Sequence, residues 1–453
     1  MRVLFIVHQY APHWIGGTEL LVQQLTRQLL TAGHEPIIIT YYEAASSHAQ
    51  DFGIYSTEAD GVRVYELRYN LSCDPEPSLA EYDNARAAHW LDQLVSAIKP
   101  DVAHVAHGMK MSGAIFRVFR RRSVPVVTTL SDFWFICMRH TLLRPDNVLC
   151  KGPDHRYRCL RCAGVTHRFA APLTTKYREP WLWLTAAWHE LRNVLARDGR
   201  NELVRDIRNI ARRKKHLRSL LLQSDRIIAF SNFQKSMYVR NGFPRDRISV
   251  IGHSGGYRST SAGSVGVDRP KGCFRIISIG TLAEFKGAHV LIEALRRVPA
   301  LDCELVLYGA PGPDAAYVDG LRRAASEDRR VRLAGTFPAR DMGKILMSAS
   351  ILAHPAIWYE NNPLVVQDAL AAGVPVVASD LGSLSELVGP VAGCTVLPAG
   401  DVDAWAAWLK NYVAREPPGP IAPPNLPRFE DFFQRMMEIY NELADEARDH
   451  RAR

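Results

Sequence analysis

The sequence predicts an α/β protein of two doubly wound domains, each a Rossmann-like parallel sheet covered by helices. Two observations predict this fold. Short apolar runs alternate with amphipathic helical stretches along the chain, and the alternation comes in two series separated by a Ser-, Gly- and Pro-rich linker at residues 259–271. We expect an N-terminal domain over residues 1–258 and a C-terminal domain over 272–420, facing each other across a cleft.

The first series begins with the apolar run at residues 3–7, which predicts a strand. A helix with leucines at helical spacing follows, and Gly33 is suited to end it. In the rest of this half, the same reasoning predicts strands at 36–40, 62–67, 102–105, 124–130, 226–230 and 248–251, and helices at 87–98 and from Ser231.

The second series predicts strands at 274–279, 303–307, 331–334, 351–354, 374–378 and 395–397. A final helix at 428–447 is so placed that we expect it to pack back across the domain junction. Ligands of parallel sheets bind beyond the carboxyl ends of the strands. We therefore expect the chemistry in the cleft between the two domains.

The positive charge is concentrated in one insertion. The net charge is +9, and residues 168–218 carry thirteen Lys or Arg against five acids. Because a nucleic-acid binder usually spreads its basic face more widely, we expect no nucleic-acid partner. The aromatic stretch at 180–189 resembles a membrane-interface anchor, and basic residues beside it would favour contact with anionic lipid. The alternative is a helical insertion packed on the N-terminal domain with a solvated basic face.

Membrane-spanning and export signals are not found in the sequence. No run approaches the roughly 18 apolar residues of a spanning helix. The first apolar run is too short for the core of a signal peptide. We expect a cytoplasmic protein, with peripheral contact at the inner face of the cytoplasmic membrane as a further expectation.

Four cysteines are clustered in a second insertion at residues 137–162, with the spacing C-x12-C-x8-C-x2-C. In a reducing compartment this pattern points to metal before disulfides, and the closing C-x2-C suits tetrahedral Zn²⁺. Scattered thiols are the alternative. Four thiolates leave no open coordination position, so the site would be structural, and its ligands would be Cys137, Cys150, Cys159 and Cys162.

No metal or other cofactor is expected for catalysis. The only Asp-x-Asp pair, Asp401 and Asp403, precedes an amphipathic stretch and is explained more simply as a helix cap and a first-turn acid.

The most informative segment is 354–388. Glu360 lies in a polar loop after a predicted strand, Pro363 opens a helix, and Asp368 lies inside that helix. Two carboxylates at this spacing can bind hydroxyls at two points of an extended ligand, and the helix start suits a phosphate. The alternative is a capping acid followed by a solvated helix residue.

This segment and three shorter motifs resemble the retaining GT-B-fold glycosyltransferases of family four, the glycosyl transferases group 1. The shorter motifs are Pro12 with Gly16-Gly17, Gly33-His34, and Gly280 with Lys286-Gly287. The resemblance implies roles by position. Glu360 lies near the donor sugar, Asp368 binds the ribose, Lys286 and the backbone of Asn362, Pro363 and Leu364 bind the diphosphate and sugar, and Gly16 and Gly17 let the backbone approach the phosphate.

The sequence departs from the family pattern at three places. Asp368 stands where Glu is usual, and Gly280-Thr281 lacks the usual Arg, for which Arg139 or Arg340 could substitute. Ser131 stands where a His often follows the strand. The neighbouring Asp132 is then the better candidate for the acceptor hydroxyl, with a turn-capping role as its alternative.

The resemblance implies transfer of a sugar from a nucleotide-diphospho-sugar to a hydroxyl of a glycan or lipid-linked glycan, with retention of anomeric configuration, in cell-surface polysaccharide synthesis. A nucleotide-sugar epimerase of the same fold and a catalytically degenerate nucleotide-sugar-binding subunit stay as alternatives. A nicotinamide dehydrogenase is disfavoured, because neither series has Gly-x-Gly-x-x-Gly after its first strand.

Overall fold

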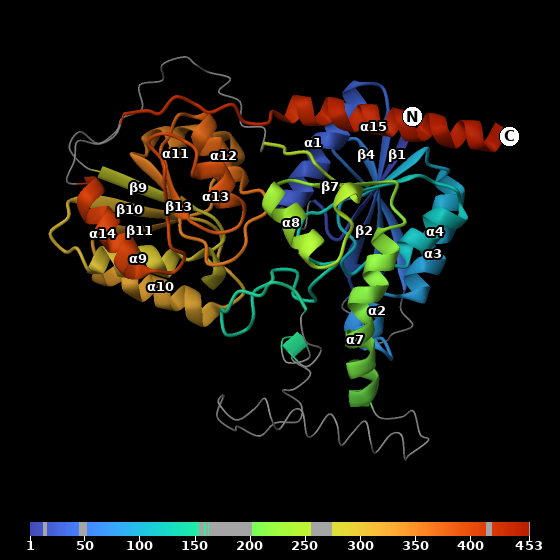
Figure 1. Cartoon of the computed structure of the whole chain (residues 1–453), viewed down its shortest axis with the longest axis horizontal. Coiled ribbons are helices and arrows are strands. Elements are labelled where there is room, and N and C mark those ends of the chain that lie inside the picture. The colour runs from blue at the N-terminus through green and yellow to red at the C-terminus, as the bar shows by residue number, and fades with distance from the viewer. Residues whose placement is uncertain are drawn as a thin grey trace. The chain divides into compact units, whose positions relative to one another are not determined.

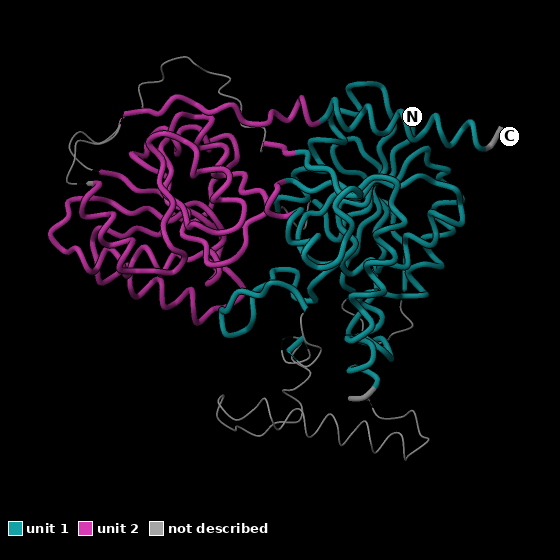
Figure 2. Tube along the Cα trace, in the orientation of Figure 1, with its two compact units in different colours: residues 1–230, 235–251, 433–453 teal, residues 231–234, 252–432 magenta. Residues whose placement is uncertain are grey.

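The computed structural model describes residues 1–11, 16–44, 52–153, 158–159, 162, 202–254, 274–413 and 419–452. The chain forms two compact units, shown in Figure 2. Unit 1 comprises Met1–Phe230, Lys235–Ile251 and Phe433–Arg453, and unit 2 comprises Ser231–Gln234 and Gly252–Phe432. The predicted linker at 259–271 and the aromatic stretch at 180–189 lie outside the described residues.

Unit 1 contains an eight-stranded sheet in the order β3-β4-β2-β1-β5-β6-β7-β8. All neighbouring strands pair in parallel except β3 and β4. The central strands are buried throughout, as apolar runs in parallel sheets are. The strands are β1 (Arg2–Val7), β2 (Glu35–Glu43), β3 (Gly53–Ala59), β4 (Val62–Tyr69), β5 (Val102–Val105), β6 (Val126–Thr129), β7 (Arg226–Ala229) and β8 (Ile248–Val250).

Helices complete unit 1 (Figure 1). The long helix α7 buries Ile210, Leu217 and Leu221, so the described part of the basic insertion packs as a structural element. The helices are α1 (Gly17–Thr31), α2 (Pro77–Ala80), α3 (Ala85–Ile98), α4 (Ile115–Arg121), α7 (Glu202–Leu221), α8 (Asn232–Arg240), whose first residues belong to unit 2, and α15 (Phe429–Ala452), which enters unit 1 at Phe433.

Unit 2 contains a six-stranded, fully parallel sheet in the order β11-β10-β9-β12-β13-β14. Its strand order is that of the doubly wound dinucleotide-binding fold, and the direction of winding reverses between β9 and β12. The strands are β9 (Phe274–Ile279), β10 (Cys303–Tyr308), β11 (Val331–Gly335), β12 (Ile351–His354), β13 (Val376–Ser379) and β14 (Thr395–Leu397).

Alternate residues of these strands supply two cores, one on each face of the sheet. Ile276 and Ile351 pack on one side, and Ile277 and Leu352 pack on the other. Helices α9 (Ala288–Arg296), α10 (Ala315–Glu327) and α14 (Val402–Val413) contribute to the first core, and α11 (Met342–Ser348), α12 (Leu364–Ala371) and α13 (Ser383–Val388) to the second. The predicted α/β fold with two doubly wound sheets is confirmed, and both sheets are parallel except for the β3–β4 pair.

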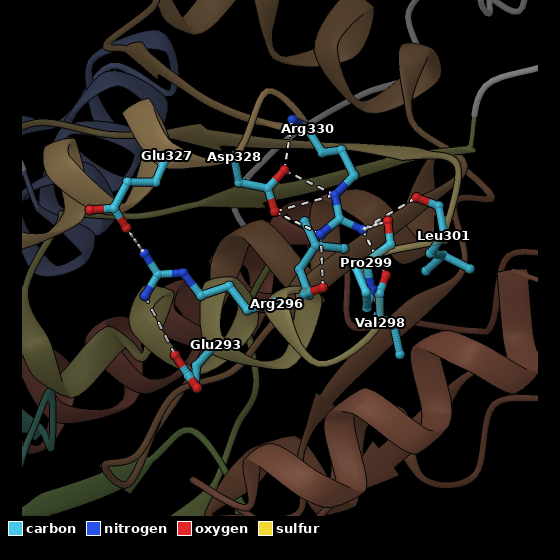
Figure 3. Close-up of polar contacts among 9 residues, drawn as sticks. Glu293, Arg296, Val298, Pro299, Leu301, Glu327, Asp328 and Arg330 are labelled. Carbon is cyan, nitrogen blue, oxygen red and sulfur yellow. Dashed lines mark hydrogen bonds and ion pairs between the residues drawn. The ribbon is translucent and has the colours of Figure 1, made fainter.

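Arg330 ties the end of α9 to the start of β11 (Figure 3). Its guanidinium donates to the carbonyls of Leu295 at 2.9 Å and Val298 at 2.7 Å and forms a bidentate pair with Asp328. These carbonyls lie at and just beyond the end of α9, where the Leu295 carbonyl also accepts from the Val298 N–H and the Val298 carbonyl from the Leu301 N–H, both at 3.1 Å. Arg330 therefore adds a charged donor to this helix end from outside the helix.

No helix among the described residues combines the length and the apolar character that crossing a membrane requires.

Candidate functional site

In unit 2 the loops after β9 and β12 meet where the sheet reverses its winding. Lys286 ends a 3₁₀ turn in the first loop, and Glu360 lies in the second. The Ile357 N–H donates to the Phe285 carbonyl at 2.9 Å. Gly287 has φ +79°, and a Cβ there would come within 1.9 Å of the Pro355 carbonyl oxygen. Only glycine permits this approach, which brings Lys286 to Glu360.

Glu360 is a buried carboxylate with three donors on one oxygen. Its Oε1 lies 2.6 Å from Lys286 Nζ, 2.9 Å from Trp358 Nε1 and 3.1 Å from His354 Nε2. A carboxylate only accepts, so His354 carries its proton on Nε2. Burial alone would raise the pKa of Glu360, but Lys286 and His354 outweigh it and hold the pKa well below its usual range. The side chain is therefore ionised.

The backbone of Glu360 is held by the loop after β13. Both the N–H and the hydroxyl of Ser383 donate to the Glu360 carbonyl, at 3.0 and 2.8 Å. Gly382 has φ +67°, and a Cβ there would meet the same carbonyl at 2.9 Å. The carboxylate thus projects from a fixed peptide.

Helix α12 begins beside this carboxylate with Pro363 as its N-cap and no side-chain cap. Asn362 donates to the His253 carbonyl at 3.0 Å and accepts from Gln367, so its amide holds the loop in place. The Leu364 N–H precedes the first intrahelical bond and can bind an anion. Asp368 is buried further along the helix. The structure thus gathers Lys286, Glu360 and the start of α12 in one unit.

Unit 1 has a second polar group at its own reversal point, between β1 and β5. His107 follows β5, and its Nε2 lies 2.8 Å from Asp132 Oδ2. The Met109 N–H donates to His107 Nδ1 at 3.0 Å, so Nε2 is the proton donor to Asp132. The other Asp132 oxygen accepts from the Trp134 N–H at 2.8 Å.

Asp132 is therefore a carboxylate whose two oxygens both accept hydrogen bonds within unit 1. Burial would raise its pKa, but its interactions with His107 and His140 outweigh burial and lower the pKa to about 2. A carboxylate this acidic is a weak base near neutral pH. Asp132 caps the turn to Trp134 and pairs with His107, so it suits binding a hydroxyl better than removing its proton.

The Gly16-Gly17 pair opens α1 close to two more ionisable residues. A Cβ at Gly16 would lie 2.7 Å from Glu19 Oε2, and Glu19 is buried. The His8 ring lies 4.2 Å from the His107 ring, centroid to centroid. Burial, with a smaller contribution from His107, lowers the pKa of His8 well below its usual value. Pro12 lies outside the described residues.

His107 and His354 were not predicted from the sequence as site residues. Each stands at the carboxyl end of a strand beside a reversal point, which was the available signal. Ser131, which replaces the expected histidine, donates to the Ala106 carbonyl at 2.7 Å and links two loops. Arg139 belongs to the cysteine-rich insertion, and Arg340 is exposed on a 3₁₀ turn of unit 2.

The four clustered cysteines, Cys137, Cys150, Cys159 and Cys162, line one cavity in unit 1. Among the residues that the structure describes, no three His, Cys, Asp or Glu side chains are arranged closely enough to hold a metal ion as they stand.

Comparisons with known proteins cover both units. Residues 16–175 match the glycosyl transferase 4-like domain, and residues 273–414 match the glycosyl transferases group 1. The D-inositol 3-phosphate glycosyltransferase of Corynebacterium diphtheriae is 30% identical over 31% of this chain and 34% of that protein. The amylovoran biosynthesis glycosyltransferase AmsK of Erwinia amylovora is 26% identical over 49% of this chain and 57% of that protein. These matches thus span from about a third to somewhat over half of the relatives' lengths.

Solved structures match over nearly the whole chain. Sucrose-phosphate synthase from Thermosynechococcus elongatus has a TM-score of 0.63 at 16% identity over 98% of both chains. Anabaena HepE in complex with UDP and glucose has a TM-score of 0.57 at 15% identity over 99% of both chains. These likenesses show the fold. The family rests on the two domain matches: residues 273–414 belong to the glycosyl transferases group 1, and residues 16–175 belong to the glycosyl transferase 4-like domain.

Proposed function

We propose that the protein transfers a glycosyl unit from a nucleotide-diphospho-sugar to a hydroxyl of a glycan or lipid-linked glycan, with retention of anomeric configuration. The observation that carries this proposal is the ionised Glu360, held by Lys286 at the start of α12. Two comparisons support it. AmsK is an amylovoran biosynthesis enzyme, and HepE has been solved with UDP-glucose. The proposed setting is cell-surface polysaccharide synthesis.

In this proposal unit 2 binds the donor. The diphosphate takes the N–H groups at the start of α12 and one of the two Lys286 donors that Glu360 does not use. Asp368 binds the ribose hydroxyls. As the glycosyl–phosphate bond breaks, negative charge builds on the diphosphate, where Lys286 and the helix dipole stabilise it. The fixed negative charge of Glu360 stabilises the positive charge that builds on the sugar as it separates from the diphosphate. The proposed reaction uses no catalytic metal.

Unit 1 supplies the acceptor side in this proposal. Asp132 is the group that would meet the acceptor hydroxyl, because its side chain is 19% exposed. His107 is 4% exposed and has both ring nitrogens engaged, by Asp132 and by the Met109 N–H, so it fixes the position of the carboxylate. Gly16 and Gly17 open α1 next to His8, where a backbone N–H can meet a phosphate or hydroxyl.

The test is turnover of a panel of nucleotide-sugars, with the product anomer read by NMR. Glu360→Gln is expected to reduce transfer by at least about a hundredfold, the usual effect of losing one transition-state contact. Its binding of the nucleoside diphosphate, read by thermal shift, should largely survive. Glu293→Gln, an exposed carboxylate of the same unit, is the control and should transfer normally.

Three results would contradict the proposal. Wild-type transfer in Glu360→Gln would remove that residue from the site. Release of an epimerised nucleotide-sugar would favour the epimerase. Binding of a nucleotide-sugar with no turnover of any acceptor would favour a binding subunit.

A lipid-linked acceptor would bring the enzyme to an anionic membrane, and α7 offers a basic stripe for that contact. Arg208, Arg212 and Lys215 are exposed at helical spacing on one face. Arg213 belongs to the opposite, buried face, where it is 2% exposed and pairs with Glu81 at 2.8 Å. The stripe therefore consists of the three exposed residues alone.

We expect Arg208→Gln/Arg212→Gln/Lys215→Gln to lose binding to anionic vesicles at low salt, because each lost charge removes about 1 kcal/mol of attraction. Co-sedimentation with phosphatidylglycerol vesicles measures this. The control, Arg63→Gln/Arg120→Gln/Arg240→Gln, removes the same charge from three exposed sites elsewhere in unit 1. Equal binding by both variants, or no binding by wild type, would contradict the proposed membrane contact.

A further inference from the structure

The cavity in the cysteine-rich insertion has a composition that the transfer reaction does not use. It encloses about 240 Å³ and is lined by all four clustered cysteines, although they are spread over the 26 residues from Cys137 to Cys162. Among the cysteines that the structure describes, these four alone line it. The fold has therefore brought four thiols to one cavity from three separate stretches of the chain.

Basic and apolar residues share the remaining lining. Among the residues that the structure describes, no Asp, Glu or His lines the cavity, whereas six basic residues do: Arg139, Arg144, Lys151, Arg158, Arg213 and Lys214. The Arg144 Nε is buried without a hydrogen-bond partner among the described residues. Arg213 is neutralised by Glu81. The described lining thus has more basic than acidic side chains, which an anionic occupant would balance.

We propose that Cys137, Cys150, Cys159 and Cys162 bind one structural Zn²⁺ as a tetrathiolate centre. Zn²⁺ with four thiolates carries a net charge of about −2, which suits the excess of basic side chains in the lining. Each thiol releases its proton on binding, so four protons leave and no redox step is needed. The sulfurs line the cavity wall without converging on a point, so the ion draws them inward from that wall.

The proposed centre would stabilise the segment that carries Asp132. Cys137 follows Asp132 by five residues, and its N–H donates to the Phe133 carbonyl at 2.7 Å. The Phe133 N–H in turn donates to the His140 carbonyl at 3.0 Å. Fixing Cys137 therefore fixes the turn on which Asp132 pairs with His107. Zinc binding can be tested independently of the proposed reaction, because the experiment measures bound metal and not sugar transfer.

The experiment measures metal in protein purified in reductant without a metal-affinity step. We expect about one zinc per chain by plasma mass spectrometry. Cys159→Ser/Cys162→Ser should lose it, whereas the matched control Cys73→Ser, a half-buried thiol of the same unit outside the cavity, should keep it.

Cys159→Ser/Cys162→Ser can fail to fold, so wild type supplies a second measurement. Titration with a mercurial should release the zinc to a zinc-responsive dye as four thiols react. Replacement by Co²⁺ should give the intense sulfur-to-cobalt absorption and tetrahedral d–d bands of a tetrathiolate site.

Four results would overturn the proposal. These are folded wild type without metal and with all four thiols reactive, a disulfide among the four by mass spectrometry, the visible absorption of an iron–sulfur cluster, and stabilisation of metal-free protein by inorganic phosphate. The last would identify the cavity as an anion site.

Discussion

The side chain of Glu360 is 8% exposed, a degree of burial that ordinarily favours the neutral acid. It is ionised because Lys286 and His354 lie against a single oxygen. Lys286 keeps a quarter of its own side chain exposed, so it can reach a ligand while it holds the carboxylate. In the proposed reaction, this one lysine would therefore act on both the carboxylate of Glu360 and the diphosphate of the donor.

Lys286→Ala is expected to weaken binding of the nucleoside diphosphate by about 10- to 150-fold, since a charged hydrogen bond contributes about 1.5–3 kcal/mol. Binding of the nucleoside should change little. The variant should also raise the pKa of Glu360, because burial then meets less opposition. Calorimetric titration of both ligands measures the difference. Lys344→Ala, an exposed lysine of the same unit, is the control. Equal losses for both ligands would place Lys286 away from the phosphates.

A site residue could be predicted from the sequence only where it stands in a recognisable motif. Glu360 and Lys286 stand in recognisable strings, and the structure brings them together. His107 stands in no such string, and only the strand order shows that it reaches Asp132. The charge of Asp132 also depends on that partner. A single sequence does not contain such a long-range pairing.

At the scale of elements, every strand of the described residues was predicted except β3. Strand β3 is half or fully exposed along its length and pairs antiparallel with β4 through Asp60-Gly61, both at positive φ. Its polar sequence lacks an apolar run, so periodicity misses it. Helix α7 was found by its charge, but its buried face includes Arg213, which charge alone would place in solvent.

Arg330→Ala is expected to lower the free energy of unfolding of unit 2 by about 2–3 kcal/mol. It removes charged hydrogen bonds to the carbonyls at the end of α9 and leaves Asp328 without its partner. Denaturant unfolding measures the loss. Arg322→Ala is the control, because its pair with Asp319 is exposed and should contribute less than about 0.5 kcal/mol. Similar losses in both variants would contradict the capping role.

At the scale of the whole molecule, α15 completes unit 1 after the chain has built unit 2. Tyr440 on this helix is buried, and its hydroxyl lies 2.5 Å from His104 Nδ1 on β5. Burial lowers the pKa of His104 to about 3. The imidazole is therefore neutral in the folded protein and has to gain a proton when the protein unfolds in acid.

This linkage has a definite sign. The folded pKa lies below the usual 6.5, so the unfolded state binds more protons as pH falls. The contribution of His104 to the free energy of unfolding is fully present above about pH 6.5 and is lost as the pH falls toward 3. At pH 5 the loss is about 2 kcal/mol. His104→Gln should reduce the difference in unfolding free energy between about pH 7.5 and 5 by that amount. The exposed His89→Gln should leave it unchanged, and identical pH profiles for wild type and His104→Gln would contradict the linkage.

Unit 1 is built from segments that lie before and after unit 2 in the chain, so its last helix is synthesised after unit 2. Residues 433–452, which bury Met436, Tyr440 and Leu443, are made only after the whole of unit 2. At about 5–20 residues per second, the nascent sheet of unit 1 waits many seconds for its last helix. During that time the apolar surface under α15 is open to chaperones. We expect ribosome-bound chains that end at Phe432, followed by a linker long enough to clear the exit tunnel, to be cleaved by protease in unit 1 while unit 2 resists. Equal resistance of both units would contradict this order.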